Sequence, residues 1–222
     1  RNNLTEDGTL WLNIGDSYYN YRPGKGQGLV KQTVSATKQD LPDKCARRGN
    51  KLEGLKEKDL IGIPWMLAFA LRADGWYLRQ DIIWNKSNPM PESVKDRCTK
   101  SHEYLFLLSK NQNYYFDVDA IKEPTRRKRS VWNITKKGYR DAHFAVYPPE
   151  LIIPCIKAGS EKNDIILDPF MGSGTTAMVA KELGRYYIGC ELQADYGNLI
   201  QEPMGVTVDK VVRNGLTSAC TD

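Results

Sequence analysis

The chain has 222 residues, of which 41% are hydrophobic and 27% charged, and it carries a net charge of +5. These values predict one globular domain with a full core, and they exclude a disordered chain or a membrane protein built of apolar spans. No signal peptide opens the sequence, so we expect a cytoplasmic protein. Five scattered cysteines without CxxC spacing and only two histidines argue against a disulfide framework and a metal site.

Apolar periodicity predicts strands alternating with helices, in an α/β fold with a largely parallel sheet. The first half of the chain should hold a strand, a long flexible loop, a helix that ends at a glycine, two strands and a short extended piece, at 9–15, 17–58, 59–75, 76–86, 102–110 and 114–117. The second half should hold a helix opened by two prolines, a strand, a further helix and a last strand, at 148–160, 165–168, 175–184 and 185–192. The tail from 202 to 222 gives no functional prediction.

A glycine-rich turn, DPFMGSGTT, runs from Asp168 to Thr176 between a predicted strand and a predicted helix. No lysine follows its glycines, so a P-loop for a nucleoside triphosphate is excluded. The dinucleotide fingerprint GxGxx(G/A) does match, at Gly172, Gly174 and Ala177, which leaves an NAD-dependent oxidoreductase open. However, the charge of Asp168 at the strand end would disfavour a pyrophosphate and favour a cation, such as the ammonium and sulfonium of S-adenosyl-L-methionine. Glu191, which ends the next strand, could accept hydrogen bonds from the ribose hydroxyls of either cofactor.

Several segments together resemble the permuted, beta-class DNA amino-methyltransferases, which modify cytosine N4 or adenine N6. The matching segments are DGTLWLNIGDSY, GIPWMLAFALRADGWYLRQDIIWNKSNPMPES, HEYLFLLSK, HFAVYPPELI, DPFMGSGTT and ELQADY, and they extend from about Asp7 to Tyr196. The resemblance implies a Rossmann-like fold for S-adenosyl-L-methionine, a mixed and mostly parallel seven-stranded sheet with one reversed strand, flanked by helices. It also implies a prokaryotic or phage source and a place in restriction and modification.

The resemblance assigns cofactor contacts to the glycine turn, to Glu191 and to the HFAVYPP segment. The implied residues are Asp168, Pro169, Phe170, Gly172, Ser173, Gly174, Thr175, Glu191, His143 and Phe144, with Pro148 nearby. It places the strand IIWNK beside the target base, which makes Trp84, Asn85 and Lys86 pocket candidates. A tryptophan on such an apolar strand is more often a core residue than a base contact, and His143 could simply cap the helix that follows. Cys155 follows a proline, as the nucleophile of cytosine C5 methyltransferases does, but isoleucines surround it, so we expect a buried structural cysteine.

The family's catalytic tetrapeptide, which begins with Asp, Asn or Ser, continues with two prolines and ends with an aromatic residue, is missing from this chain. It should stand upstream of residue 9, and RNNLTEDG resembles the last turn of the helix that would follow it. We therefore expect no catalytic residue within 1–222 and a domain that lacks its native amino-terminal part. A non-catalytic DNA-binding subunit with the same fold is the alternative.

Basic residues are concentrated between Glu92 and Arg140, where twelve lysines and arginines face six acidic residues. This span, 92–140, coincides with the family's target-recognition region, and the partner that it predicts is double-stranded DNA. Four consecutive residues would contact the DNA backbone: Arg126, Arg127, Lys128 and Arg129. Phosphate contacts position a protein without reading sequence, so the recognised bases stay open, as does a homodimer.

Overall fold

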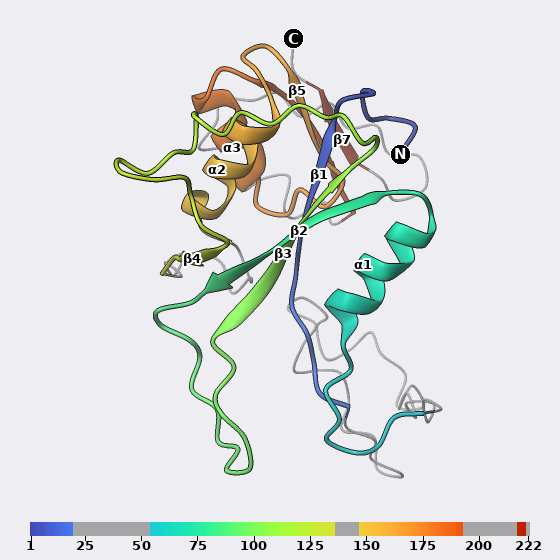
Figure 1. The fold of residues 1–222 in the computed structure, drawn as a ribbon, viewed down its shortest axis with the longest axis vertical. Helices are drawn as coiled ribbons and strands as arrows, with labels where there is room; N and C mark the ends of the chain where they lie inside the picture. Colours follow the sequence, from blue (N-terminus) through green and yellow to red (C-terminus); the bar gives the residue numbers. More distant parts are fainter. Residues whose placement is uncertain (20–53, 136–146, 193–216, 221–222) are drawn as a thin grey trace, which may run out of the picture.

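The computed structural model describes residues 1–19, 54–135, 147–192 and 217–220. Within them the chain forms three helices and seven strands (Figure 1). In chain order these are β1 (Thr9–Ile14), α1 (Ile63–Ala73), β2 (Tyr77–Asn85), β3 (His102–Ser109), β4 (Val131–Asn133), α2 (Pro149–Gly159), β5 (Ile165–Asp168), α3 (Thr175–Glu182), β6 (Tyr186–Glu191) and β7 (Thr217–Cys220). None of the described helices is long and apolar enough to cross a membrane.

Four strands form one sheet in the order β1-β3-β2-β4. β3 runs antiparallel to both of its neighbours, whereas β2 and β4 are parallel, so β3 is the one reversed strand of this sheet. Successive side chains of a strand point to opposite faces, and this separates Phe106 from Leu105. Phe106 packs under α1 with Ala68, while Leu105 packs under α2 with Leu151, so the two helices cover opposite faces.

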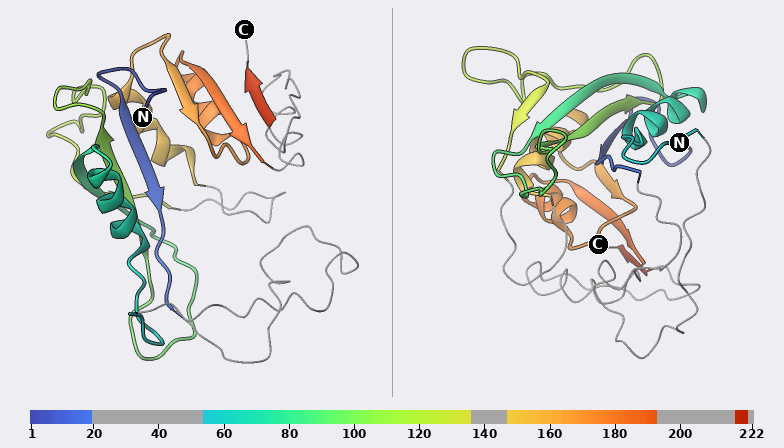
Figure 2. Two further views of the ribbon diagram at one scale, coloured as in Figure 1. Left: turned by 90° about the vertical axis from the view of Figure 1, so that its right-hand side faces the viewer. Right: turned by 90° about the horizontal axis from the view of Figure 1, so that it is seen from below.

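The remaining strands form a second sheet in the order β5-β6-β7, with β5 and β6 parallel and β7 antiparallel to β6. α2 joins the two sheets, because neighbouring faces of this helix enter different cores. Leu151 and Cys155 pack against the four-stranded sheet, and Ile156 packs with α3 and β6. Figure 2 shows the two sheets next to each other, with β1 and β5 on the facing edges. Among the described residues β1 pairs only with β3, and β5 pairs only with β6.

The prediction of a mixed sheet flanked by helices is confirmed, but the described strands do not form one largely parallel sheet. Three of their five pairings are antiparallel, because β3 returns between β1 and β2, and because β7 pairs with β6 in reverse. β4 and β7 were not predicted from the sequence. The extended piece at 114–117 joins no strand, and residues 1–8 form two hydrogen-bonded turns, Arg1 to Leu4 and Thr5 to Gly8, where a helix end was expected.

The two ends of the predicted loop at 17–58 lie together, and its interior, 20–53, is outside the described residues. Tyr19 and Asp59 share a backbone hydrogen bond of 2.8 Å, and Ile61 donates to the carbonyl of Ser17 at 2.9 Å. Just after β1, the carboxylate of Asp16 accepts the backbone N–H groups of Gly62 and Ile63, both at 3.0 Å. A side chain from another element thus caps the amino terminus of α1.

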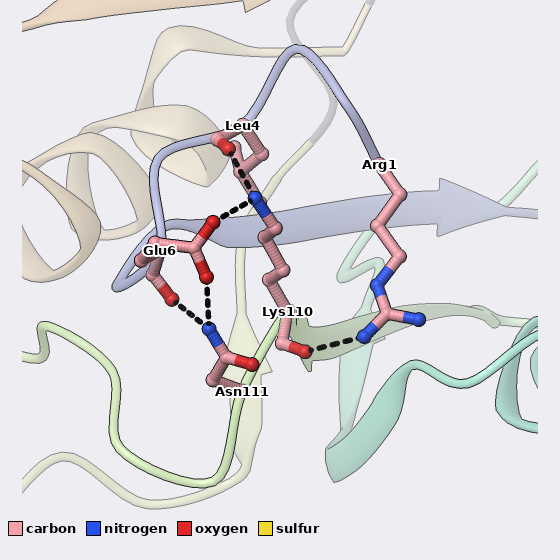
Figure 3. Close-up of polar contacts among 5 residues, drawn as sticks. All are labelled: Arg1, Leu4, Glu6, Lys110 and Asn111. Atoms are coloured by element: carbon pink, nitrogen blue, oxygen red, sulfur yellow. Dashed lines mark hydrogen bonds and ion pairs between the residues drawn. The ribbon is translucent and has the colours of Figure 1, made fainter.

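The first eight residues are attached to the end of β3 by a small polar cluster (Figure 3). Lys110 Nζ donates to Glu6 Oε1 at 2.6 Å and to the carbonyl of Leu4 at 3.0 Å. Asn111 Nδ2 donates to the carbonyl and the carboxylate of Glu6, at 2.7 and 2.8 Å, and Arg1 donates to the carbonyl of Lys110 at 3.1 Å. The hydrogen bonds from Lys110, followed by those from Asn111, hold the pKa of the Glu6 carboxyl below its ordinary value of 4.5.

Replacing Lys110 with methionine should release residues 1–8, since methionine keeps the apolar stem and removes the charged donor. We expect faster amide hydrogen exchange there and unchanged exchange in β3, with Lys122→Met as the exposed control. In the unmodified chain the same release should follow acidification. Because folding lowers the Glu6 pKa, the contact is complete above pH 4.5 and is lost as the pH falls through the lowered value. Exchange that did not change in Lys110→Met would show that this cluster does not hold the segment.

Candidate functional site

The glycine turn lies between the carboxyl end of β5 and the amino end of α3, as the sequence predicts. Gly172 and Gly174 have φ angles of 54° and 85°, in the left-handed region that a residue with a Cβ rarely adopts. Near Gly172 an added Cβ would meet only the carbonyl of Phe170, at 3.9 Å. The turn therefore offers bare backbone to a ligand, and Thr175 begins the helix directly behind it.

The carboxylate of Asp168 is held by donors on both of its oxygens. Oδ1 accepts the backbone N–H of Phe170 at 2.9 Å, which fixes the start of the turn. Oδ2 accepts the hydroxyl of Thr176 at 2.6 Å and lies 3.1 Å from the hydroxyl of Tyr147. A negative charge is thus placed in a fixed orientation where β5 ends, as a cationic ligand group would require.

Glu191, at the end of β6, contacts the glycine turn from the strand next to β5. Its Oε2 accepts the backbone N–H of Gly172 at 2.8 Å, and the N–H of Met171 donates to the carbonyl of Cys190 at 2.9 Å. The turn is therefore attached to the ends of both β5 and β6. In addition to any ribose contact, Glu191 orients the glycine backbone, a role that the sequence did not indicate.

The structure thus brings the predicted cofactor residues of the turn and Glu191 together at the carboxyl ends of β5 and β6. Phe170 is 85% exposed, the largest exposed fraction among the large apolar side chains of the described residues, and Pro169 beside it is also exposed. Ser173 is half-buried within the turn. His143 and Phe144 lie outside the described residues, and their predicted contacts with the cofactor stay predictions.

Tyr147 and Thr176 are site residues that the sequence analysis did not single out. Their hydroxyl oxygens lie 2.6 Å apart. Thr176 could have been inferred, since it stands in the first turn of the helix that begins behind Asp168. Tyr147 could not, because its approach depends on how α2 packs against α3.

The candidates for a target-base pocket lie at the carboxyl end of β2, in the other sheet. Trp84 is 2% exposed, and its indole N–H donates to the carbonyl of Ile134 at 2.9 Å, so it occupies the core. Asn85 Nδ2 donates to Asn133 Oδ1 at 2.8 Å. Lys86 forms an ion pair with Glu103, and its Nζ lies 4.6 Å above the Trp84 ring. Of the three, only Asn85 and Lys86 present polar groups near the strand end.

The four basic residues of the predicted DNA contact precede β4. Arg127 and Arg129 are exposed, whereas Arg126 is paired with Glu123 at 2.6 Å. Lys128 is half-buried, with its Nζ 4.8 Å from the centre of the Trp132 ring. The predicted span 92–140 contains β3, where a strand was expected, and also β4, and residues 136–140 lie outside the described residues.

Cys155 is a buried core residue, as predicted. Its side chain is 4% exposed and donates to the carbonyl of Leu151 at 3.2 Å. Burial raises the pKa of this thiol well above its ordinary value, so the nucleophilic thiolate is disfavoured. A covalent cysteine mechanism of the cytosine C5 type therefore has no support at this position.

An α/β fold with a glycine turn, an acidic strand end before it and a second acidic residue on the next strand defines a nucleotide-cofactor domain of the methyltransferase class. A model of the family described as DNA methylase matches residues 1–202. The chain belongs to this DNA methylase family.

Its similar proteins include two Type II methyltransferases. M.Cfr9I of Citrobacter freundii is 51% identical over 198 residues, which cover 87% of this chain and 63% of that protein. M.SmaI of Serratia marcescens is 49% identical over 214 residues, which cover 91% of this chain and 69% of that protein. The chain thus spans about two thirds of the length of these relatives.

Two solved structures extend the comparison. The cytosine-N4-specific PvuII DNA methyltransferase superposes with a TM-score of 0.68 at 16% identity, over 95% of this chain and 67% of that one, a likeness of fold alone. M1.HpyAVI in complex with SAM gives a TM-score of 0.51 at 29% identity, over 64% of this chain and 70% of that one. The predicted methyltransferase fold is thereby confirmed.

Proposed function

We propose that the chain is the cofactor-binding part of a site-specific DNA methyltransferase. The enzyme transfers a methyl group from S-adenosyl-L-methionine to the exocyclic amine of a flipped cytosine (N4) or adenine (N6) in double-stranded DNA. It acts in the cytoplasm of a prokaryotic or phage-infected cell, as part of a restriction and modification system. The observation that carries the proposal is the glycine turn held between Asp168 and Glu191, in a chain of the DNA methylase family.

The described residues fit S-adenosyl-L-methionine, whose sulfonium makes its methyl group electrophilic. The fixed Asp168 carboxylate suits the cationic methionine end, and the left-handed glycines let a nucleoside approach the backbone. The exposed Phe170 ring offers an apolar surface to the adenine. Pro169, Ser173, Thr175 and Glu191 complete the described set, and His143 and Phe144 are proposed to join it. The NAD alternative rested on the glycine spacing and Glu191, which serve either cofactor, and the chain belongs to a DNA methylase family, which favours S-adenosyl-L-methionine.

We further propose that one strand from outside residues 1–222 lies between β1 and β5 and joins the two sheets. The facing edges of β1 and β5, to which no other described strand is paired, support this, as does α2, which already packs against both sheets. Apolar side chains on the β5-β6 face remain exposed, with Ile165 at 61%, Leu167 at 45% and Tyr186 at 54%. With this strand in place, the domain would have one continuous sheet. We propose that an amino-terminal segment outside residues 1–222 supplies the strand.

The DNA would contact the exposed basic residues before β4, and Asn85 and Lys86 would lie near the target base. We expect Arg127→Ala combined with Arg129→Ala to reduce the slope of log affinity against log salt concentration by about 2, since each phosphate contact contributes about 0.9. Arg126→Ala should change it less, because Glu123 already pairs with its guanidinium. Fluorescence anisotropy with a duplex at several salt concentrations measures the slopes. Arg72→Ala, on α1, is the control, and equal slopes for all variants would contradict the assignment.

A non-catalytic DNA-binding subunit remains the second candidate, because residues 1–222 contain no catalytic tetrapeptide. Two measurements test the proposal. Binding of S-adenosylhomocysteine by the chain tests the cofactor site. Methyl transfer to DNA by a longer protein, extended at its amino terminus with the sequence encoded upstream of residue 1, tests the enzymatic activity.

A further inference from the structure

Three side chains from different elements meet at one oxygen atom in the cofactor site. Asp168 is the last residue of β5, and the atom concerned is its Oδ2. Thr176 lies in the first turn of α3, and Tyr147 lies two residues before the start of α2. The three oxygen–oxygen distances are 2.6 Å between Thr176 and Asp168, 2.6 Å between the hydroxyls, and 3.1 Å between Tyr147 and Asp168. Thr176 is buried, and Tyr147 is half-buried.

The protons in this group can be counted. A carboxylate only accepts, and each hydroxyl brings one proton. Two protons therefore serve three contacts. Either Thr176 donates to Asp168 while Tyr147 donates to Thr176 or to Asp168, or Tyr147 donates to Asp168 while Thr176 donates to Tyr147. With the Phe170 N–H on Oδ1, the described residues occupy at most three of the roughly four lone-pair positions of the carboxylate, which leaves one among them to accept from a ligand.

We propose that Tyr147 and Thr176 are positioning residues, which fix the Asp168 carboxylate so that its remaining acceptor position faces the ammonium of the cofactor's methionine end. This inference rests on the proposed function. Tyr147 would also couple the site to α2, so the carboxylate would keep its orientation only while α2 and α3 stay packed together. Neither residue is assigned a chemical step.

The environment of Tyr147 is consistent with a neutral donor. Burial, and next the negative charge of Asp168, raise the pKa of the phenol far above its ordinary value of 10.0. The hydrogen bond between Tyr147 and Thr176 opposes this rise in pKa without reversing it. Tyr147 therefore keeps its proton throughout the working pH range and does not act as a base.

The test compares two ligands that differ at the methionine end. S-adenosylhomocysteine carries the ammonium, whereas 5′-methylthioadenosine keeps the adenosine and the thioether but has no amino-acid group. We expect Tyr147→Phe and Thr176→Val each to weaken binding of S-adenosylhomocysteine about tenfold in calorimetric titration of the full chain, the size expected for one hydrogen bond to a charged group. Binding of methylthioadenosine should change less than about twofold. Thr176→Ser, which keeps the hydroxyl, should restore the affinity for S-adenosylhomocysteine.

The outcomes separate this inference from the proposed function. An equal loss for both ligands, or no loss for either, would overturn the positioning role, since a merely structural role would not distinguish a ligand with the amino-acid group from one without it. Thermal unfolding of each variant shows whether it is folded, and Tyr147→Phe keeps the Thr176 contact with Asp168 if Thr176→Val proves unstable. A wild-type chain that binds neither ligand would instead refute the cofactor site itself.

Discussion

Replacing Asp168 with alanine should abolish binding of S-adenosylhomocysteine, with a loss of affinity of about 100-fold or more. The carboxylate has two functions in the structure. It accepts the N–H of Phe170 at 2.9 Å and the hydroxyl of Thr176 at 2.6 Å, and we propose that it also supplies the charge for a cationic ligand. A hydrogen bond to a charged group contributes about 1.5–3 kcal/mol, so losing the ligand contact and the anchor of the turn together gives an effect of this size. Calorimetric titration with S-adenosylhomocysteine and, separately, with NADH measures it.

Asp168→Asn separates the two functions, because asparagine keeps the shape and one acceptor oxygen but carries no charge. We expect it to retain the fold, measured by thermal unfolding, and still to bind S-adenosylhomocysteine at least tenfold more weakly than the wild type. If Asp168→Asn binds as tightly as the wild type, charge does not recognise the cofactor. A wild-type preference for NADH would mean that the glycine turn has been misread.

Elements with a strong local pattern could be predicted from the sequence. The apolar runs of β1 and β3, the apolar spacing of α1 and the prolines that open α2 each favour one type of element. Glycines also marked two helix ends correctly, as Gly75 and Gly184 follow α1 and α3 with φ angles of 95° and 74°. The strand-turn-helix order around Asp168 placed the cofactor residues within a few positions in the chain, so local geometry was enough to predict that they would meet.

The features that were missed depend on tertiary contacts. β4 is three residues long, and only Trp132 among them is buried, so a basic sequence with one aromatic residue gave no strand pattern. Trp84 fits a base-stacking position by its place in the motif, but its indole N–H is satisfied by Ile134 in a core that only the folded sheet creates. Likewise, Tyr147 reaches Asp168, 21 residues away, through the packing of α2 on α3.

Residues 1–222 alone are expected to transfer no methyl group to DNA above background, even though they bind the cofactor. Methylating an exocyclic amine needs a group that holds the amine and directs its lone pair at the methyl group, and such a positioned acceptor contributes about 10²–10⁴ in rate. Two proline-containing segments of the chain, NPMP at 88–91 and YPPE at 147–150, do not match the tetrapeptide and cannot substitute for it. Asn88 is followed by a proline and by Met90, which is 77% exposed, and Tyr147 is already bound at the Asp168 carboxylate.

A product extended through the upstream reading frame should transfer labelled methyl groups from S-adenosyl-L-methionine to duplex DNA, and alanine at the first tetrapeptide position should abolish this. The same extension should slow amide exchange in β1 and β5, because a strand between them would pair both open edges. Transfer by residues 1–222 alone would contradict the assignment of catalysis to another segment. If the extended product protects β1 and β5 and binds DNA but lacks the tetrapeptide, the chain is the non-catalytic subunit. Strand completion and catalysis are thus tested separately, since the first depends on backbone pairing and the second on one acceptor side chain.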